Sequence, residues 1–206
     1  MTTESAVRNL APVGILAYGS LISDPGVEIG PMIVKRIPTR TPFSVEYARF
    51  STTRGGAPTA VPHPSGSPVK AVVLVLTDGV PIAEARDLLW RRETRNEGSG
   101  RTYRESRSSN AVIVRDLPGF CGLESVIYTD LSPDGKVEIP DPESLAEAAI
   151  ASVGRANAGK DGISYLIDLL EAGVETPLTR RYIAEILART SASDLADALR
   201  KSMDSQ

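Results

Sequence analysis

Short runs of hydrophobic residues, each ended by glycine, proline or a polar cluster, fill most of the N-terminal part of the chain. Runs of this length and composition predict β-strands. The run at 69–76 is apolar on both faces apart from Lys70, so we expect it inside a sheet. Glycines and prolines from 55 to 68 predict a loop. In all we expect about six strands, at residues 13–18, 32–37, 43–50, 69–76, 111–114 and 125–129.

One helical pattern interrupts the strands. Pro81 suits the first turn of a helix, where its missing N–H costs nothing. Ile82, Ala85, Leu89 and Glu93 follow at spacings of three or four residues, which places them on one helix face. Glu93 should therefore point to the apolar side, where loss of hydration favours the neutral carboxyl group. The alternative is a glutamate that pairs with a neighbouring arginine at the helix end.

The hydrophobic spacing becomes helical after residue 140. The segment Asp141-Pro142-Glu143 combines a capping side chain, a first-turn proline and a first-turn acid, which together predict a helix start. Thr176-Pro177 repeats this pattern, Ser193 is expected to cap a last short helix, and residues 163–170 carry an apolar helix face. Strands followed by three or four helices predict an α+β fold rather than alternating βαβ units.

The composition is that of an ordinary globular protein. The chain has 206 residues, 41% of them hydrophobic, and a net charge of −3. This predicts a single domain over residues 1–206 and excludes a protein that binds nucleic acid through bulk positive charge. One cysteine, Cys121, and one histidine, His63, are too few for a disulfide framework or a multi-histidine metal site. We therefore expect no metal site.

Targeting signals are also not apparent in the sequence. No apolar run approaches the roughly 18 residues that a membrane-spanning helix needs. The first ten residues carry Glu4 and Arg8 and lack the apolar segment of a secretory signal. These features predict a soluble, cytoplasmic protein with no membrane partner, and they leave its oligomeric state open.

A basic run with interleaved acids follows the predicted helix. Interleaved charge weakens a nucleic-acid interpretation. The run is either a solvated helix end and loop or a basic rim that binds an acidic small molecule. Its basic members are Arg91, Arg92, Arg95, Arg101, Arg104 and Arg107, and its acids are Glu93, Glu97 and Glu105.

The turn after the first strand is the second candidate for chemistry, beside Glu93. The sequence Tyr18-Gly19-Ser20-Leu21 places a glycine where a strand enters a loop. Such a turn lets backbone N–H groups converge on one point and bind a carboxylate or a developing oxyanion. Taken together, the turn and Glu93 would give an anion-binding group and a general acid or base.

These segments resemble a known family. Residues 14–21 (GILAYGSL) resemble the N-terminal motif of the γ-glutamylcyclotransferase-like superfamily, in its ChaC-like branch. Arg49-Phe50 and residues 54–58 (RGGAP) resemble the segment that follows in that branch. Residues 88–93 (LLWRRE) resemble the helix end that holds the family's catalytic glutamate. Residues 162–166 and 182–187 resemble the C-terminal helices of the branch.

The resemblance implies a small β-barrel flanked by helices, with a barrel core at about 11–132 and C-terminal helices at about 141–203. It implies cofactor-free release of 5-oxoproline from a small γ-glutamyl substrate, either glutathione or a γ-glutamyl amine. The substrate's own amine attacks its γ-carbonyl, so the protein mainly holds the substrate in a reactive shape. The implied catalytic residue is Glu93, and the implied substrate-binding residues are Tyr18, Gly19, Ser20, Leu21, Arg54 and Tyr103.

Two alternatives remain open within the resemblance. Residues 94–102 separate Glu93 from Tyr103, a longer interval than the branch usually has, so the leaving group is undefined. Glu97-Gly98 resembles the Glu-Gly of the other branch, but Glu93 is preferred because of its inward helical phase. The chain is either an active cyclotransferase or a non-catalytic member that binds a small anionic metabolite. A Glu93 side chain bonded to arginine would favour the second.

Overall fold

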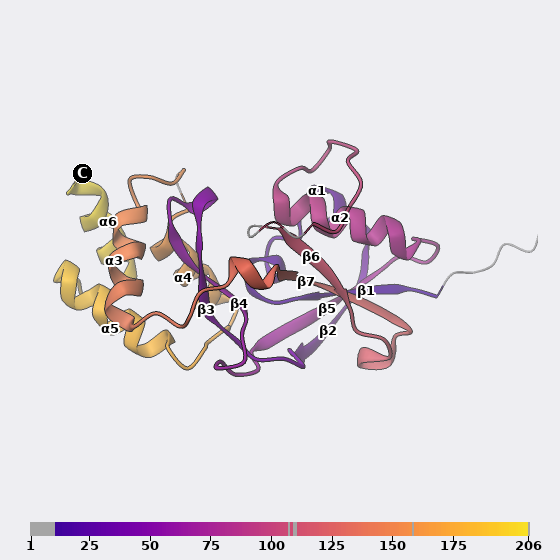
Figure 1. The fold of residues 1–206 in the computed structure, drawn as a ribbon, viewed down its shortest axis with the longest axis horizontal. Helices are drawn as coiled ribbons and strands as arrows, with labels where there is room; N and C mark the ends of the chain where they lie inside the picture. Colours follow the sequence, from indigo (N-terminus) through magenta and orange to yellow (C-terminus); the bar gives the residue numbers. More distant parts are fainter. Residues whose placement is uncertain (1–10, 107, 109–110, 158, 206) are drawn as a thin grey trace, which may run out of the picture.

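The computed structural model describes residues 11–106, 108, 111–157 and 159–205. Residues 1–10, on which the expectation about a signal sequence rests, lie outside this part, as does Arg107 of the basic run. The described residues form two sheets and six helices, which confirms the α+β class (Figure 1).

Seven strands make up the two sheets of the described chain. The larger sheet has the strand order β2-β5-β1-β7-β6, and β1 and β7 are its parallel pair. β5 lies between β2 and β1, so the most apolar run is an interior strand, as predicted. β3 and β4 form a two-stranded sheet of their own. The bounds are β1 Val13–Ala17, β2 Ile33–Arg40, β3 Val45–Ser51, β4 Ala57–Pro62, β5 Lys70–Leu76, β6 Val112–Asp116 and β7 Ser125–Leu131.

The helices divide into two groups (Figure 1). α1 and α2 lie together against the larger sheet, and the C-terminal helices gather at the other end of the molecule, beside β3 and β4. Two short 3-10 turns matter for the site: η1, Gly19–Ile22, follows β1, and η3, Thr52–Arg54, joins β3 to β4. The helices are α1 Gly26–Ile29, α2 Ile82–Thr94, α3 Pro142–Ser152, α4 Gly162–Glu171, α5 Thr179–Thr190 and α6 Leu195–Asp204.

The described strands do not close into a barrel. β2 and β6 each have one hydrogen-bonded neighbour and form the two edges of the larger sheet. β3 and β4 form a separate ribbon beside it. The barrel implied by the family resemblance is therefore corrected to an open five-stranded sheet accompanied by a two-stranded one.

The loop predicted from 55 to 68 contains a strand, β4, so that prediction was partly wrong. Pro58 and Pro62 suggested irregular chain, but they lie opposite Phe50 and Val45 in the antiparallel pair with β3. Because β4 has a partner on one side only, a missing N–H on its other side breaks no ladder hydrogen bond. Glycines at 55 and 56, with φ of 65° and 87°, make the preceding turn.

α2 packs its inner face on the larger sheet. Ala85 and Leu89 are fully buried and share one hydrophobic cluster with Ile15 of β1, which confirms the predicted inward face at these positions. Ile82, in contrast, is 36% exposed at the start of the helix. The helix ends at Thr94 because Arg95 takes the left-handed conformation, with φ of 57°. The last turn of α2 lies beside the turn after β1, where Arg92 contacts Ser20.

The C-terminal helices form a second core with β3. The predicted cap of α3 at Asp141 is confirmed, because the Asp141 carboxylate accepts a 2.7 Å hydrogen bond from the N–H of Ser144. At α6 the prediction was off by one residue. Asp194 caps this helix and accepts a 2.8 Å hydrogen bond from the N–H of Asp197, so Ser193 lies just before the cap.

α5 begins differently from the prediction. The helix starts at Thr179 after Leu178, which has no capping side chain of its own. Instead, the N–H of Leu178 donates a 3.3 Å hydrogen bond to the carboxylate of Glu46, a residue of β3 that is 1% exposed. A buried carboxylate from a distant strand thus takes the place that the local Thr176-Pro177 pattern was expected to fill.

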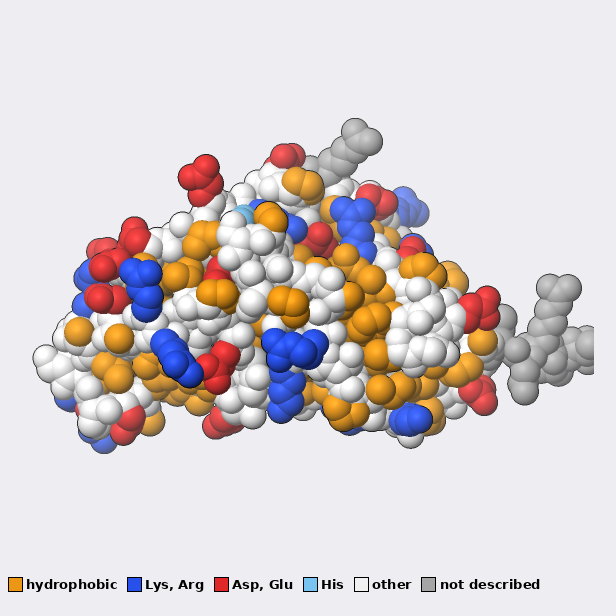
Figure 2. Space-filling view, turned by 90° about the horizontal axis from the view of Figure 1, so that it is seen from below, with side chains coloured by type: hydrophobic (Ala, Val, Ile, Leu, Met, Phe, Trp, Pro, Cys, Tyr) orange, Lys and Arg blue, Asp and Glu red, His pale blue; other side chains and the backbone are white. Residues whose placement is uncertain are grey.

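The molecular surface seen from below mixes side chains of all kinds (Figure 2). Basic and acidic groups are interspersed with apolar ones on this face, in keeping with the small net charge of the chain. Within the described residues, the helices are all too short or too polar to cross a bilayer.

Candidate active site

A cleft of about 640 Å³ lies where the two sheets, α2 and α4 meet. This volume is in the range of sites that bind small metabolites. Tyr18 and η1, which follow β1, line the cleft together with the end of α2, the end of β7, the β3–β4 ribbon and α4. Residues of its lining include Tyr18, Ser20, Leu21, Arg49, Arg54, Thr59, Arg92, Glu93, Glu97, Asp130, Lys160, Tyr165 and Asp168.

The turn after β1 has the geometry that its glycine suggested. Gly19 has a φ of 77°, a conformation that residues with a side chain rarely adopt. It opens the 3-10 turn η1, and the first N–H groups of such a turn have no carbonyl partner within it. Ser20 and Leu21 of this turn line the cleft. The turn that forms this part of the cleft wall therefore contains backbone N–H groups of the kind that can donate to an oxyanion or a carboxylate.

Tyr18 joins this wall to β7. Its hydroxyl donates a short hydrogen bond to the backbone carbonyl of Thr129. Burial raises the pKa of the Tyr18 phenol well above its usual value, and the negative charges of Asp130 and Glu93 raise it further. Tyr18 is therefore neutral at physiological pH, and its proton is committed to a carbonyl group. It can shape the cleft, but it is poorly placed to act as an acid or base.

Glu93 lies in the cleft and is paired with its neighbour Arg92. The Arg92 Nη1 atom donates to Glu93 Oε1 at 2.8 Å, and the glutamate side chain is 25% exposed. Among the described residues this is the one hydrogen bond recorded for the Glu93 carboxylate. Glu93 therefore lines the cleft as a partly exposed carboxylate that pairs with a neighbouring arginine, which is the alternative interpretation, and the prediction that it points to the apolar side is corrected. The reason is that Glu93 lies one turn beyond Leu89, in the last turn of α2, where the helix borders the cleft.

Arg92 connects this carboxylate to the turn after β1. Its guanidinium lies 3.4 Å from the hydroxyl of Ser20 and also donates to the backbone carbonyl of Asp24. The Arg92 side chain is 12% exposed; its contacts with Ser20 and Glu93 are partly buried, whereas the contact with Asp24 is at the surface. One arginine therefore links Ser20, 72 residues earlier in the chain, to the adjacent Glu93.

Two further arginines enter the cleft from the β3 side. Arg54 stacks its guanidinium on the Tyr165 ring, 4.7 Å from the ring centre, and donates to the Lys160 carbonyl at 3.4 Å. Arg49 lies on β3 opposite Thr59. Burial lowers the pKa of both guanidinium groups, and the Glu93 charge opposes that effect at Arg49. Both arginines stay charged at neutral pH, because an arginine pKa starts so high.

The structure brings together most of the residues predicted for the site, but Tyr103 is an exception. Tyr18, Ser20, Leu21, Arg54 and Glu93 line one cleft, and Gly19 forms the turn between them. The Tyr103 hydroxyl accepts a 3.1 Å hydrogen bond from the N–H of Val114, and its ring packs in the cluster under α2. It does not line the cleft, so we leave it out of the candidate site.

Sequence reasoning missed several members of the cleft. Arg49 and Tyr165 occur in segments that carry the family resemblance, but nothing in their local patterns directs them to a shared cavity. Arg92 was read as part of a basic run. Asp168 follows Tyr165 by three residues on α4, a spacing that places both on one side of that helix. Burial raises the pKa of the Asp168 carboxyl, and Arg54 acts against that rise.

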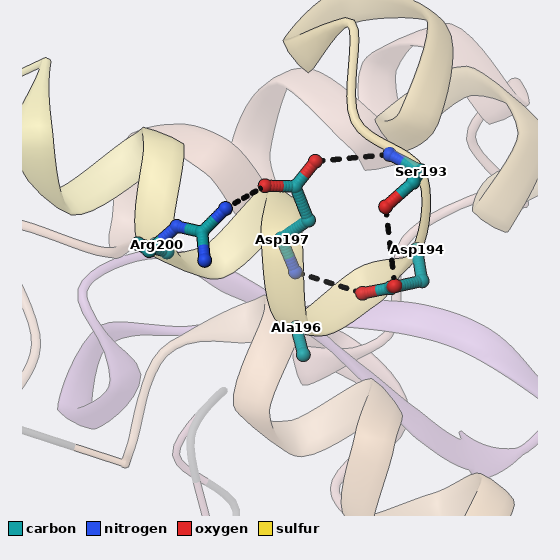
Figure 3. A pocket seen from close by; sticks show the side chains of 5 residues that line it. All are labelled: Ser193, Asp194, Ala196, Asp197 and Arg200. Atoms are coloured by element: carbon teal, nitrogen blue, oxygen red, sulfur yellow. Dashed lines mark hydrogen bonds and ion pairs between the residues drawn. The ribbon is translucent and has the colours of Figure 1, made fainter.

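A second, smaller hollow lies at the start of α6 (Figure 3). Its polar groups make hydrogen bonds to one another. Asp197 accepts from the N–H of Ser193 and from Arg200, and Asp194 caps the helix. These contacts account for the helix start and give no sign of a ligand. In the described parts of the chain, no three His, Cys, Asp or Glu side chains are grouped as a metal site would require.

Comparisons with known proteins add fold similarities alone. No family model matches the chain, and no curated protein matches it. A crystal structure of a γ-glutamyl cyclotransferase specific to glutathione from yeast aligns with a TM-score of 0.46 and 14% identity, covering 95% of this chain and 99% of that one. A selenomethionine-labelled form of the same description aligns with a TM-score of 0.44 and 14% identity, covering 94% and 96%. We draw no functional conclusion from similarities at this level.

Proposed function

We propose that the protein is a γ-glutamyl cyclotransferase, which releases 5-oxoproline from a small γ-glutamyl substrate. The proposal rests on the motif resemblance and on one structural observation. The Glu93 carboxylate lies in a cleft of metabolite size and is linked through Arg92 to Ser20, a residue of the turn that lines the same cleft. Under this proposal residues 1–206 form a single domain of the γ-glutamylcyclotransferase-like kind.

The reaction needs an acid–base group and an oxyanion-binding group, and no outside reactant. The substrate's α-ammonium loses a proton, and its nitrogen attacks the γ-carbonyl carbon. The attacking nitrogen then loses a second proton, the tetrahedral intermediate collapses, and the bond from this carbon to the leaving nitrogen breaks. The leaving nitrogen takes up both protons, so a five-membered lactam and a free ammonium result and atoms balance without water. Holding the chain in this folded shape supplies much of the rate.

The cleft residues divide these tasks. Glu93 takes the ammonium proton and returns it to the leaving nitrogen, since one carboxylate can serve first as base and then as acid. The N–H groups of Ser20 and Leu21 stabilise the oxyanion that develops on the γ-carbonyl oxygen. Arg92 holds the Glu93 carboxylate in a fixed position relative to the turn that contains Ser20. Tyr18 forms a neutral wall of the cleft beside them.

A second candidate function has its own support. The ion pair between Arg92 and Glu93 is the contact that a non-catalytic, anion-binding protein would have, because it occupies one oxygen of the candidate base. In that case the turn and the arginines of the cleft would bind a small anionic metabolite without converting it. The partial exposure of Glu93 keeps the first candidate in front, since the carboxylate remains within reach of a bound molecule.

One experiment separates the two candidates. The purified protein is incubated with a panel of γ-glutamyl compounds, including glutathione, γ-glutamyl amino acids and γ-glutamyl amines, and 5-oxoproline is measured by mass spectrometry. Release above the spontaneous rate, lost in Glu93→Gln, is the result expected for a cyclotransferase. Binding of panel members by calorimetry with no 5-oxoproline release would support the anion-binding protein.

A further inference from the structure

Arg92 lies between two carboxylates that come from different parts of the chain. Its Nη1 atom donates to Glu93 Oε1 at 2.8 Å. Its Nη2 atom donates to the backbone carbonyl of Asp24 and lies 3.7 Å from Asp24 Oδ2. Both acids line the cleft, but the Glu93 side chain is 25% exposed and that of Asp24 is 70% exposed. One guanidinium is therefore shared by the candidate base and by an aspartate at the rim of the cleft.

The two carboxylate oxygens of Asp24 have different partners. Oδ1 accepts a 3.2 Å hydrogen bond from the N–H of Gly26, at the start of α1, and Oδ2 is the oxygen closest to Arg92. The main chain is held separately, because the Asp24 N–H donates to the Ser20 carbonyl at 2.9 Å and the Asp24 carbonyl accepts from Arg92. An asparagine at this position can keep these hydrogen bonds. It removes only the negative charge beside Arg92.

That charge weakens the attraction between Arg92 and Glu93. A guanidinium that serves a single carboxylate makes a strong, charge-assisted hydrogen bond to it, and a second carboxylate attracts the same positive charge in another direction. Among the described residues, the Glu93 carboxylate has its one hydrogen bond from Arg92, so a change at Arg92 acts directly on the candidate base. Glu97 also lines the cleft, but its carboxylate accepts from the N–H of Val27 instead.

We propose that Asp24 is a positioning residue that acts on Glu93 through Arg92. Because Asp24 shares the guanidinium, Arg92 holds Glu93 in place without competing fully with the substrate ammonium for its carboxylate. This inference rests on the proposed cyclotransferase function. It adds to that function a residue outside the Tyr18–Leu21 turn and outside α2, which influences proton transfer without contacting the reacting atoms.

The test compares steady-state kinetics of the wild type and Asp24→Asn on the γ-glutamyl compound that the wild type converts fastest. We expect kcat to fall about two- to fivefold, the range that an exposed ion pair allows, and KM to change by less than about twofold. Asp24→Glu, which restores the charge, should recover most of the lost kcat. Asp116→Asn is the matched control, because it removes a carboxylate from Arg86 of the same helix, outside the cleft, and should leave kcat unchanged.

A double-mutant cycle with Arg92→Gln tests whether Asp24 acts through Arg92. Without the guanidinium, Asp24→Asn should change kcat by less than about 1.5-fold, and an undiminished effect would overturn the inference. If Arg92→Gln is too slow to measure, the recovery in Asp24→Glu decides.

Three further outcomes would also overturn the inference. In the first, Asp24→Asn loses activity through a higher KM alone, which would assign Asp24 to substrate binding. In the second, Asp24→Asn has the kcat of an active wild type, and the proposed function then stands without this residue. In the third, the wild type releases no 5-oxoproline from any γ-glutamyl compound, so the proposed function itself fails and the inference fails with it.

Discussion

The carboxylate of Glu97 accepts a 2.8 Å hydrogen bond from the backbone N–H of Val27, 70 residues earlier in the chain. Gly26 permits this approach, because a Cβ atom there would lie 2.2 Å from the Glu97 oxygen. Glu97 thus satisfies an N–H at the start of α1 and holds the loop after α2 to that helix. Among the described residues, the Glu93 carboxylate makes no hydrogen bond to a distant element, which distinguishes the two candidate bases.

We predict that Glu93→Gln abolishes turnover and that Glu97→Gln does not. Gln keeps the shape and hydrogen bonding of Glu93 but cannot take a proton from the substrate ammonium. The loss in kcat should be at least about 10² to 10⁴-fold, the usual contribution of general acid–base catalysis. Glu97→Gln should keep most of the activity and lower the free energy of unfolding by about 0.3–1 kcal/mol, through its contact with α1.

The measurements are 5-oxoproline release and urea denaturation for both variants. An inactive Glu97→Gln together with an active Glu93→Gln would transfer the catalytic role to Glu97. Full activity in both, on a substrate that the wild type converts, would mean that proton transfer uses neither glutamate.

Gly19 gives a second prediction, which separates conformation from space. A Cβ atom at this position would have Leu169 Cδ2 at 3.5 Å as its nearest neighbour, an ordinary contact. The φ of 77° is the obstacle, since a side chain in that conformation costs about 1–2 kcal/mol. Gly19→Ala should therefore lower stability by about this amount in urea denaturation and weaken substrate binding as the turn relaxes. Gly19→Val should be worse.

Unchanged stability together with unchanged substrate binding in Gly19→Ala would show that the turn adopts another conformation without cost. Unchanged stability together with lost substrate binding would instead indicate that the methyl group obstructs the cleft directly.

The sequence predicted those features that are decided within a few neighbouring residues. The apolar run of β5, the Asp141 cap and the inward side of Ala85 and Leu89 all depend on local spacing and chemistry. The glycine in the turn after β1 is of the same kind, because a turn there needs a residue that tolerates positive φ.

Features that depend on pairing between distant segments could not be predicted in this way. β4 forms because β3 is available to pair with prolines on an edge, which no local propensity reveals. The opposition of Arg49 and Thr59 depends on the register of that pair. The family resemblance implies that Tyr103 belongs to the site. Its hydroxyl instead accepts a hydrogen bond from the backbone N–H of Val114 in β6, and its ring packs beneath α2.

Acid sensitivity gives a third prediction. The Arg91 guanidinium, 2.9 Å from the Glu28 carboxylate, holds the pKa of that carboxyl below its usual value of 4.5. A depressed pKa in the folded state means that the ion pair stabilises the protein fully above the unfolded value and is lost as pH falls through the folded value. Stability should therefore fall as pH decreases from about 4.5.

Glu28→Gln should lessen this dependence, because it removes the titrating group. The check is urea denaturation between neutral pH and about pH 3, with Glu147→Gln, at an exposed position of α3, as the control. Identical slopes of stability against pH in Glu28→Gln and the wild type would show that other carboxyl groups dominate acid unfolding.

Tyr165 allows the last prediction, which separates its hydroxyl from its ring. The hydroxyl accepts a 3.3 Å hydrogen bond from the N–H of Ala60, and the ring carries the Arg54 guanidinium at 4.7 Å. Burial raises the pKa of this phenol, so it is neutral at physiological pH and its replacement changes no charge. Tyr165→Phe should lower stability by about 0.5–1.5 kcal/mol and keep kcat/KM for a γ-glutamyl substrate that the wild type converts. Tyr165→Leu removes the aromatic face that orients Arg54 in the cleft, so kcat/KM should fall about threefold or more. Steady-state kinetics alongside urea denaturation measures the two effects. Equal loss of kcat/KM in the Phe and Leu variants would assign the orienting role to the hydroxyl, and unchanged kcat/KM in both would show that Arg54 needs no aromatic support.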